Sequence, residues 1–111
     1  MTGLAIRRGE IWWTAFEHSA GGEIRKTRPA VVISNDEANA ILNRVQIVPI
    51  RSRVSRIYPS EALLRINGRP CKAMADQLTT ADKARLRSRI GKVTRDEMKA
   101  IDAAVRTQLA L

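Results

Sequence analysis

Short hydrophobic segments separated by polar turns fill most of the chain before residue 94, and this pattern predicts strands. Residues 9–16 (GEIWWTAF) are rich in aromatic and β-branched side chains, which favour strands. Pro29 opens a second segment, AVVIS, whose β-branched run is typical of a buried central strand that starts at its proline. Further strands are predicted at residues 45–50, 61–66, 71–78 and 89–93.

Turn-forming residues mark the ends of these strands. Residues 17–26 contain two consecutive glycines and several polar side chains, and they predict a mobile loop between the first two strands. Pro49 lies inside the third strand and indicates a sheet edge or a bulge, because proline lacks the backbone donor. Asn67-Gly68 predicts a hairpin turn between the fourth and fifth strands.

Two helices are predicted. Ser34-Asn35-Asp36 ends the second strand and supplies an N-cap for a short helix from Asp36 to about Leu42. Thr94 and Glu97 form the T-x-x-E pattern of a capping box, which marks the start of a helix that continues to the C-terminus. Its apolar residues recur every three or four positions, so the helix is amphipathic. They are Met98, Ile101, Val105 and Leu109, with Ala104 beside them.

Several short strands followed by a terminal helix predict a mostly β fold with α (α+β). We expect a small, partly closed antiparallel barrel, with a short helix after the second main strand and the amphipathic helix at the C-terminus. The chain has 111 residues, of which 44 % are hydrophobic, and this suits one domain over residues 1–111. One apolar stripe is sufficient to dock the terminal helix on the barrel.

The charge of the chain points to a polyanionic partner. Twenty Lys and Arg residues face eleven Asp and Glu residues, which gives a net charge of +9. Fifteen of the twenty cations are Arg, whose planar fork binds phosphate with two hydrogen bonds. We therefore expect a nucleic acid or an acidic protein as partner, with an arginine-rich coding bias as the alternative. The aromatic content of 4 % argues against a base-stacking platform.

The sequence also predicts where the protein works. Its longest unbroken hydrophobic run, Ala30–Ile33, is far shorter than the roughly 18 residues that cross a bilayer. The N-terminus carries charge where a signal peptide is apolar. The single cysteine, Cys71, cannot form an intrachain disulfide, which suits a reducing compartment. We expect a soluble cytoplasmic protein with no membrane partner.

Several kinds of chemistry are excluded by the residue types present. One Cys and one His cannot make a zinc site. The acidic pairs Asp36/Glu37 and Asp96/Glu97 lie at predicted helix starts, where the helix dipole accounts for them without a metal ion. The lone His18 also excludes a ribonuclease mechanism that uses two histidines. A nuclease with this sequence is expected to work without metal and without a cofactor.

Four segments of the chain resemble the MazF/PemK toxins, the mRNA-cleaving halves of bacterial toxin–antitoxin pairs. In order and spacing, these segments are RRGEIWW (7–13), GGEIRKTRPAVVISND (21–36), IVPIRS (47–52) and ADQL (75–78). The resemblance implies a compact SH3-like barrel of the type found in CcdB, MazF and PemK, and a homodimer. It also implies metal-independent cleavage of single-stranded mRNA through 2′-OH attack, and an antitoxin whose acidic tail covers the active groove.

The resemblance places the catalytic arginine of the family at Arg28, immediately before Pro29. A guanidinium is well shaped to stabilise the charge that builds on a pentacoordinate phosphorus, and it is a poor base because it stays protonated. A strand-end salt bridge is the alternative role for Arg28. The loop acid of the family falls on Glu23, as a base or a substrate-positioning group, with a solvated loop charge as the alternative.

The third segment departs from the family pattern. Family members carry Thr two residues after the proline of V-P-x-T, and that position here is Arg51, followed by Ser52. Adjacent strand residues face opposite sides, so Ser52 replaces the Thr only if a bulge or a strand end re-aims it. Either Ser52 is the catalytic hydroxyl, or Arg51 has taken over the phosphate contact. Asp76 matches an acid–base group of some PemK-type members, with a carboxylate paired to arginine as the alternative.

The remaining candidates concern binding and packing. The predicted RNA-binding residues are Lys26, Arg51, Arg53, Arg56 and Gln77, the last as a reader of a base edge. Trp12 and Trp13 are interpreted as barrel packing and dimer contact, because neighbouring strand residues face opposite ways. Cys71 is interpreted as a small apolar filler.

Two other functions stay open on the sequence. CcdB-like gyrase poisons share the expected fold and act by binding a protein, and the missing Thr allows this reading. Such proteins do not need the Arg28–Pro29 segment, which this chain keeps. The second alternative is a family member that binds RNA but cleaves it weakly.

Overall fold

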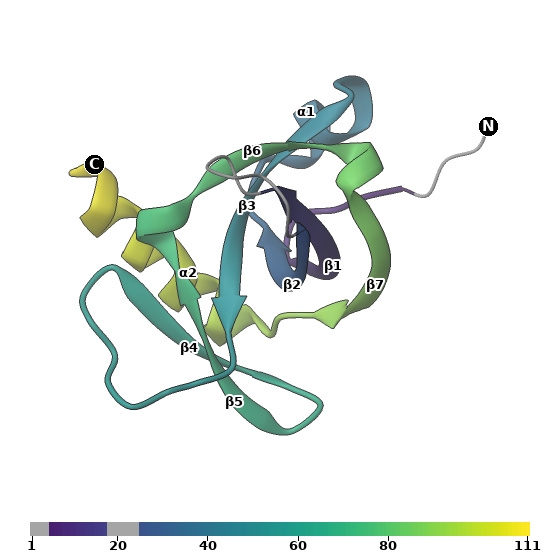
Figure 1. The fold of residues 1–111 in the computed structure, drawn as a ribbon. Coiled ribbons are helices and arrows are strands. Elements are labelled where there is room, and N and C mark those ends of the chain that lie inside the picture. The colour runs from purple at the N-terminus through teal and green to yellow at the C-terminus, as the bar shows by residue number, and fades with distance from the viewer. Residues whose placement is uncertain (1–4, 18–24) are drawn as a thin grey trace.

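A computed structural model describes residues 5–17 and 25–111 of the chain (Figure 1). The strands are β1 (Glu10–Glu17), β2 (Arg25–Val32), β3 (Arg44–Arg51), β4 (Glu61–Ile66), β5 (Arg69–Met74), β6 (Thr79–Asp82) and β7 (Leu86–Lys92). The helices are α1 (Asp36–Ile41) and α2 (Arg95–Leu109), and short 3₁₀ turns at Ala75–Gln77 and Lys83–Arg85 flank β6. No helix in the described part of the chain is long and apolar enough to cross a membrane.

The strands form one curled antiparallel sheet with β3 near its centre. Its order is β4-β5-β3-β2-β1-β7, and β6 also pairs with β3. On the side away from β2, the strand β3 pairs first with β6 through Arg44–Ile47 and then with β5 through Ile50–Arg51. Figure 1 shows β6 and β7 curving around β1, β2 and β3. The predicted mostly β fold, a partly closed antiparallel barrel with a terminal helix, is confirmed.

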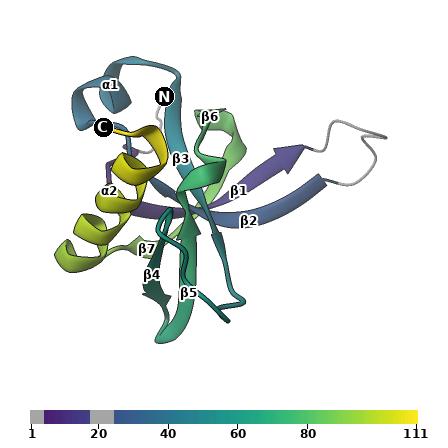
Figure 2. The ribbon, with the colours of Figure 1, turned by 90° about the vertical axis from the view of Figure 1, so that its left-hand side faces the viewer.

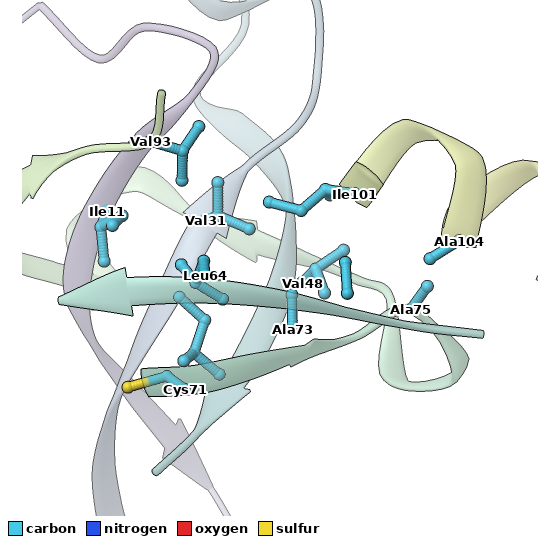
Figure 3. Packing of buried hydrophobic residues seen from close by; sticks show 12 residues of the cluster. Ile11, Val31, Val48, Leu64, Cys71, Ala73, Ala75, Val93, Ile101 and Ala104 are labelled. Carbon is cyan, nitrogen blue, oxygen red and sulfur yellow. The ribbon is translucent and has the colours of Figure 1, made fainter. Parts of the chain in front are cut away.

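β3 and the second half of β2, from Ala30 on, are buried on both faces. Because side chains alternate along a strand, Val31 joins a cluster with Val48 and with Ile101 of α2 (Figure 3). Its neighbours Ala30 and Val32 join a second cluster on the opposite face. This two-sided burial explains the unbroken apolar run in β2, and it confirms the prediction of a buried central strand.

The two prolines of the central strands occupy positions where a ladder partner is missing. β2 begins at Arg25, so the prediction that Pro29 opens the strand is wrong. Residues 25–31 pair with β1, whereas the pairing of β2 with β3 begins only at Ala30. The proline is tolerated because this part of β2 has no partner on the β3 side. Pro49 lies in a central strand and not at an edge, but it falls between the residues that pair with β6 and with β5.

The chain after the β4–β5 hairpin differs most from the predictions. Asn67 and Gly68 form the predicted turn, with φ angles of 51° and 80°. The strand predicted over 71–78 ends at Met74, because the 3₁₀ turn that follows redirects the chain toward β3. β6 was not predicted, since Ala81 is its only buried residue. The last strand begins at Leu86 and not at Arg89, because exposed polar side chains hide its pairing with β1.

Arg8 ties the N-terminal segment to both helices. Its backbone N–H donates to the Asp36 carboxylate at 2.7 Å, and this hydrogen bond holds the pKa of Asp36 below its usual value. The Arg8 guanidinium binds both carboxylate oxygens of Asp102 on α2, at 2.5 and 2.6 Å, and also the carbonyl of Ile33. The predicted helix α1 is confirmed, with Asn35 as its N-cap accepting the Ala38 N–H at 2.8 Å.

The terminal helix α2 begins with the predicted capping box. The Thr94 hydroxyl accepts the Glu97 N–H at 3.1 Å, and Glu97 accepts the Thr94 N–H at 2.8 Å. The second Glu97 oxygen accepts the Arg65 N–H of β4 at 2.9 Å, which attaches the helix start to the sheet. Figure 2 shows α2 on the opposite side of the molecule from the projecting β1–β2 ribbon. Ile101 is fully buried, whereas Leu109 is 49 % exposed, so the apolar stripe ends before Leu109.

The helix contact gives a first prediction. Replacing Ile101 by Ala leaves a cavity between α2 and the sheet, and we expect it to lower the free energy of unfolding by about 2–5 kcal/mol. Replacing Leu109 by Ala serves as the matched control, with an expected change within about 0.5 kcal/mol because the side chain is half exposed. Urea denaturation of both variants measures the difference. Equal losses would contradict the position of the helix.

Candidate active site

The site lies where β2 and β3 separate. Their ladder ends at the pair formed by Ala30 and Pro49. Continuing the same register places Pro29 opposite Ile50 and Arg28 opposite Arg51. Because Pro29 has no backbone donor, the two strands cannot be drawn together by a hydrogen bond from this residue. Arg28 and Arg51 therefore lie on neighbouring strands just past the point where backbone pairing stops.

Two hollows flank this pair of arginines. The larger, of about 510 Å³, is lined by Trp13, Arg28, Pro29, Ile50, Arg51, Ser52, Arg53 and Cys71. The smaller, of about 260 Å³, is lined by Phe16, Lys26, Arg28, Pro49, Arg51 and Gln77. Arg28 and Arg51 are common to both, so they form the boundary between the two hollows.

Positive charge dominates both hollows. Arg53 adds a third cation to the larger hollow, and Lys26 adds a third to the smaller. No Asp or Glu is among the described residues that line either hollow. The surrounding walls are apolar, with Pro29 and Ile50 on one side and Phe16 on the other. This arrangement suits a chain of anionic groups joined by flat apolar ones, which describes a nucleic acid.

Ser52 reaches the larger hollow because β3 ends at Arg51. Beyond the strand end the alternation of faces no longer holds, so Arg51 and Ser52 line the same hollow. Of the two geometries considered from the sequence, the strand end is the one that the fold adopts. Four candidate residues, Arg28, Arg51, Ser52 and Arg53, are thus brought together from two strands and a loop.

The other candidates are distributed differently. Lys26 and Gln77 line the smaller hollow. Asp76 lies beside Gln77 in the 3₁₀ turn but lines neither hollow. Arg56 is also absent from both linings, and its guanidinium lies 5.7 Å from the centre of the Tyr58 ring. Glu23 lies outside the described residues.

The two tryptophans have separate roles. Trp12 is 2 % exposed and its indole N–H donates to Glu10 at 3.1 Å, so the packing interpretation is confirmed for this residue. Trp13 is 42 % exposed and lines the larger hollow, which the sequence reasoning missed. Because side chains alternate along a strand, one of the two tryptophans must face away from the core. Trp12 and Thr14 are both buried, so the outward-facing residue is Trp13.

Cys71 belongs to the core, and the described residues offer no cluster of metal-binding side chains. The Cys71 side chain is buried in the core cluster under the larger hollow, so its interpretation as an apolar filler is confirmed (Figure 3). Within residues 5–17 and 25–111, no three side chains of His, Cys, Asp or Glu are grouped so that they can hold a metal ion.

The chain matches a known protein family over nearly its whole length. Residues 7–109 match the family described as PemK-like, MazF-like toxin of type II toxin–antitoxin system. This chain belongs to that family. The protein named Endoribonuclease MazF9 from Mycobacterium tuberculosis is 36 % identical over 115 residues, which cover 96 % of this chain and 98 % of that protein. The resemblance read from the four sequence segments is therefore confirmed.

Solved structures share the fold over nearly the whole chain. One is described as an endoribonuclease in complex with its cognate antitoxin from Mycobacterial species. It has a TM-score of 0.82 and 23 % identity, and the match covers 96 % of this chain and 97 % of that one. Another, a MazE–MazF crystal structure from Deinococcus radiodurans, has a TM-score of 0.83 and 24 % identity, with coverage of 98 % and 99 %.

Proposed function

We propose that this MazF-family endoribonuclease toxin cleaves single-stranded mRNA in the cytoplasm, without a metal ion, by attack of a ribose 2′-hydroxyl on the adjacent phosphodiester. The observation that carries the proposal is the pair Arg28 and Arg51, which lies between two cationic hollows. A phosphodiester has one nucleoside on each side, and the site has one hollow on each side of its two guanidiniums. The scissile phosphate binds the arginines, and its neighbouring nucleosides occupy the hollows.

Arg28 acts in this mechanism as a stabiliser of the transition state. As the 2′-oxygen bonds to phosphorus, negative charge builds on the non-bridging oxygens, and a guanidinium fork donates two hydrogen bonds to them. The bond from phosphorus to the 5′-oxygen then breaks, leaving a 2′,3′-cyclic phosphate and a 5′-hydroxyl. The proton lost by the 2′-hydroxyl is balanced by the proton gained by the 5′-oxygen.

The remaining candidate residues divide between chemistry and binding. The Ser52 hydroxyl lies in the same hollow as Arg28 and supplies the second donor to the reacting phosphate. Arg51, Arg53 and Lys26 bind neighbouring phosphates, and Gln77 contacts a base edge in the smaller hollow. Asp76 and Glu23 are the candidates for proton transfer. Arg56, which stacks on Tyr58, extends the cationic surface outside the hollows.

A family member that binds RNA but cleaves it weakly is the second candidate function. It is favoured by one observation, the arginine at the position where family members carry Thr. The gyrase-poison alternative loses support, because the chain belongs to the PemK-like, MazF-like family and keeps the Arg28–Pro29 segment in the lining of the hollow.

Two partners belong to the same proposal. The first is a cognate antitoxin, as in the solved complex of a mycobacterial endoribonuclease with its antitoxin. An acidic, extended antitoxin segment suits the same two hollows, because they carry cations and no described acid. The second is another copy of this chain. Trp13 is available for a dimer contact, whereas Trp12 is buried.

The first test of the proposal concerns catalysis. Arg28→Ala should lower the rate of RNA cleavage in EDTA by at least about a hundredfold, the cost of removing an oxyanion-hole-type donor. Arg28→Lys should restore little, because an ammonium does not reproduce the fork. Arg106→Ala, an exposed arginine on α2, is the control for lost charge. Wild-type cleavage by folded Arg28→Ala protein would refute the assignment, and gel analysis with end-group mapping gives the readout.

The second test separates Ser52 from Arg51. Ser52→Ala should cleave RNA much more slowly while keeping its affinity for RNA. Arg51→Ala should bind RNA more weakly, and the slope of log affinity against log salt should fall by about 0.7, the value of one single-strand phosphate contact. Fluorescence anisotropy over a range of salt concentrations measures both. If both variants behave as wild type, this corner of the site has no part in the reaction.

The third test concerns the partners. Because RNA and the antitoxin are proposed to use the same hollows, the acidic antitoxin should displace labelled RNA competitively, and the dimer should sediment as one species at micromolar concentration. Arg28→Ala should weaken the binding of RNA and the binding of the antitoxin, whereas Arg106→Ala should change neither affinity. Simultaneous binding of RNA and antitoxin without mutual loss of affinity would exclude a shared groove. A monomer at micromolar concentration would exclude the dimer.

A further inference from the structure

Lys72 is a buried cation on the outer face of the β4–β5 hairpin. Its neighbours Cys71 and Ala73 face the core, so alternation points Lys72 away from it. Even so, only 7 % of Lys72 is exposed. The loop that joins β3 to β4, residues 52–60, contacts this side chain through Arg56 and Tyr58.

The Lys72 ammonium makes two hydrogen bonds, one to this loop and one to Glu61 at the start of β4. It donates to the backbone carbonyl of Arg56 at 3.1 Å and to the Glu61 carboxylate at 3.0 Å. The same Glu61 oxygen accepts the backbone N–H of Tyr58 at 3.0 Å. The Tyr58 ring lies over the ammonium, 5.7 Å from its centre. The two side chains therefore bind one loop carbonyl and one loop amide from the hairpin below.

The pair is better suited to fixing geometry than to adding stability. Lys72 and Glu61 have side-chain exposures of 9 % and 12 %, so both pay a desolvation cost that apolar residues avoid. This burial disfavours the charged form of Glu61, but the hydrogen bonds from Tyr58 and Lys72 outweigh it and hold the pKa of Glu61 below its usual value. An apolar pair would fill the same space, but it would not bind the loop backbone.

The loop in question carries two residues of the site. It begins directly after Arg51, which is the strand partner of Lys72 on β5, and Glu61 directly follows its last residue. Lys72 thus contacts the chain at the start, in the middle and at the end of the loop. Ser52 and Arg53, at its start, line the larger hollow. The Arg56 carbonyl that Lys72 binds, the anchor of the loop, is three residues from Arg53 and four from Ser52, so a shift of the loop at Arg56 is expected to move both side chains.

We infer that Lys72 and Glu61 are positioning residues, which fix the β3–β4 loop so that Ser52 and Arg53 face Arg28 across the larger hollow. The inference rests on the proposed ribonuclease function. Neither residue lines a hollow, and they act only through the loop backbone.

Limited trypsin digestion tests the anchor without any RNA. Trypsin cleaves after arginine, and the carbonyl of the Arg56–Ile57 bond is the one that Lys72 binds. In Lys72→Met, cleavage at this bond should be about tenfold faster or more, the factor for losing one charge-assisted hydrogen bond. Arg8→Met is the matched control, because it also removes one cation and one ion pair, with Asp102, on another part of the fold. Mass spectrometry identifies the bond that is cut.

RNA measurements test whether the anchor positions the site. Lys72→Met should lower kcat about tenfold and also raise KM, because Ser52 and Arg53 both lose their positions, and Lys72→Arg should keep most of the activity because its fork also donates twice. In the wild-type background Arg53→Ala should weaken RNA binding, whereas in the Lys72→Met background it should add little. Glu61→Gln, which keeps an acceptor for the Tyr58 amide, should show smaller changes in the same direction and guards against a misfolded Lys72→Met.

Each outcome decides a separate claim. Equal trypsin cleavage of the Arg56–Ile57 bond in Lys72→Met, Glu61→Gln and wild type would overturn the anchor. Faster trypsin cleavage with additive effects of Lys72→Met and Arg53→Ala on RNA binding would overturn the positioning role. Loss of activity in Arg8→Met equal to that in Lys72→Met would also overturn it. If the wild-type protein does not cleave RNA, the proposed function fails, while the trypsin comparison still decides the anchor.

Discussion

The end of the β2–β3 ladder is the constraint on which the rest of the site depends. Where they are buried on both faces, β2 and β3 pair as far as Ala30 and Pro49, and they separate where Pro29 removes a backbone donor. Everything beyond that point is held by side chains and by neighbouring elements instead of by this ladder. Arg28 on β2, which pairs here with β1, and Arg51 at the end of β3, which pairs with β5, are therefore placed at a gap in the sheet by paired strands. Such support gives a binding site its precision.

Placing like charges across such a gap has a cost in stability. Arg28 and Arg51 lie opposite each other in the continued register, and no described acid lines the hollows beside them. Like charges at opposed strand positions are destabilising. The stability of the fold comes from elsewhere, mainly from apolar burial such as the cluster that Ile101 joins under α2. The described residues that line the hollows thus give the site a positive field that attracts an anion.

The sequence predicts the parts of this fold that are encoded locally. The capping box at Thr94, the N-cap at Asn35 and the Asn67-Gly68 turn depend on neighbours within a few residues, and all were found. The errors concern pairing between distant segments. β2 extends before its proline because β1 pairs with it there, and β6 exists because β3 offers a free edge to a segment with one buried residue. In the same way, motif spacing singled out Arg28 and Ser52 but not Trp13, although all three line the larger hollow. The direction of the Trp13 side chain depends on which face of β1 packs against the core.

The long loop after β3 links these observations. A site formed where a ladder ends has no backbone partner to fix its last residues, and in this chain Ser52 and Arg53 follow immediately after Arg51. The hairpin supplies the missing restraint from below, through a buried ammonium that binds the Arg56 carbonyl and a carboxylate that binds the Tyr58 amide. Those two bonds act on backbone atoms, so they restrain the loop whatever its side chains are. A restrained loop keeps the hydroxyl of Ser52 beside Arg51 in the same hollow.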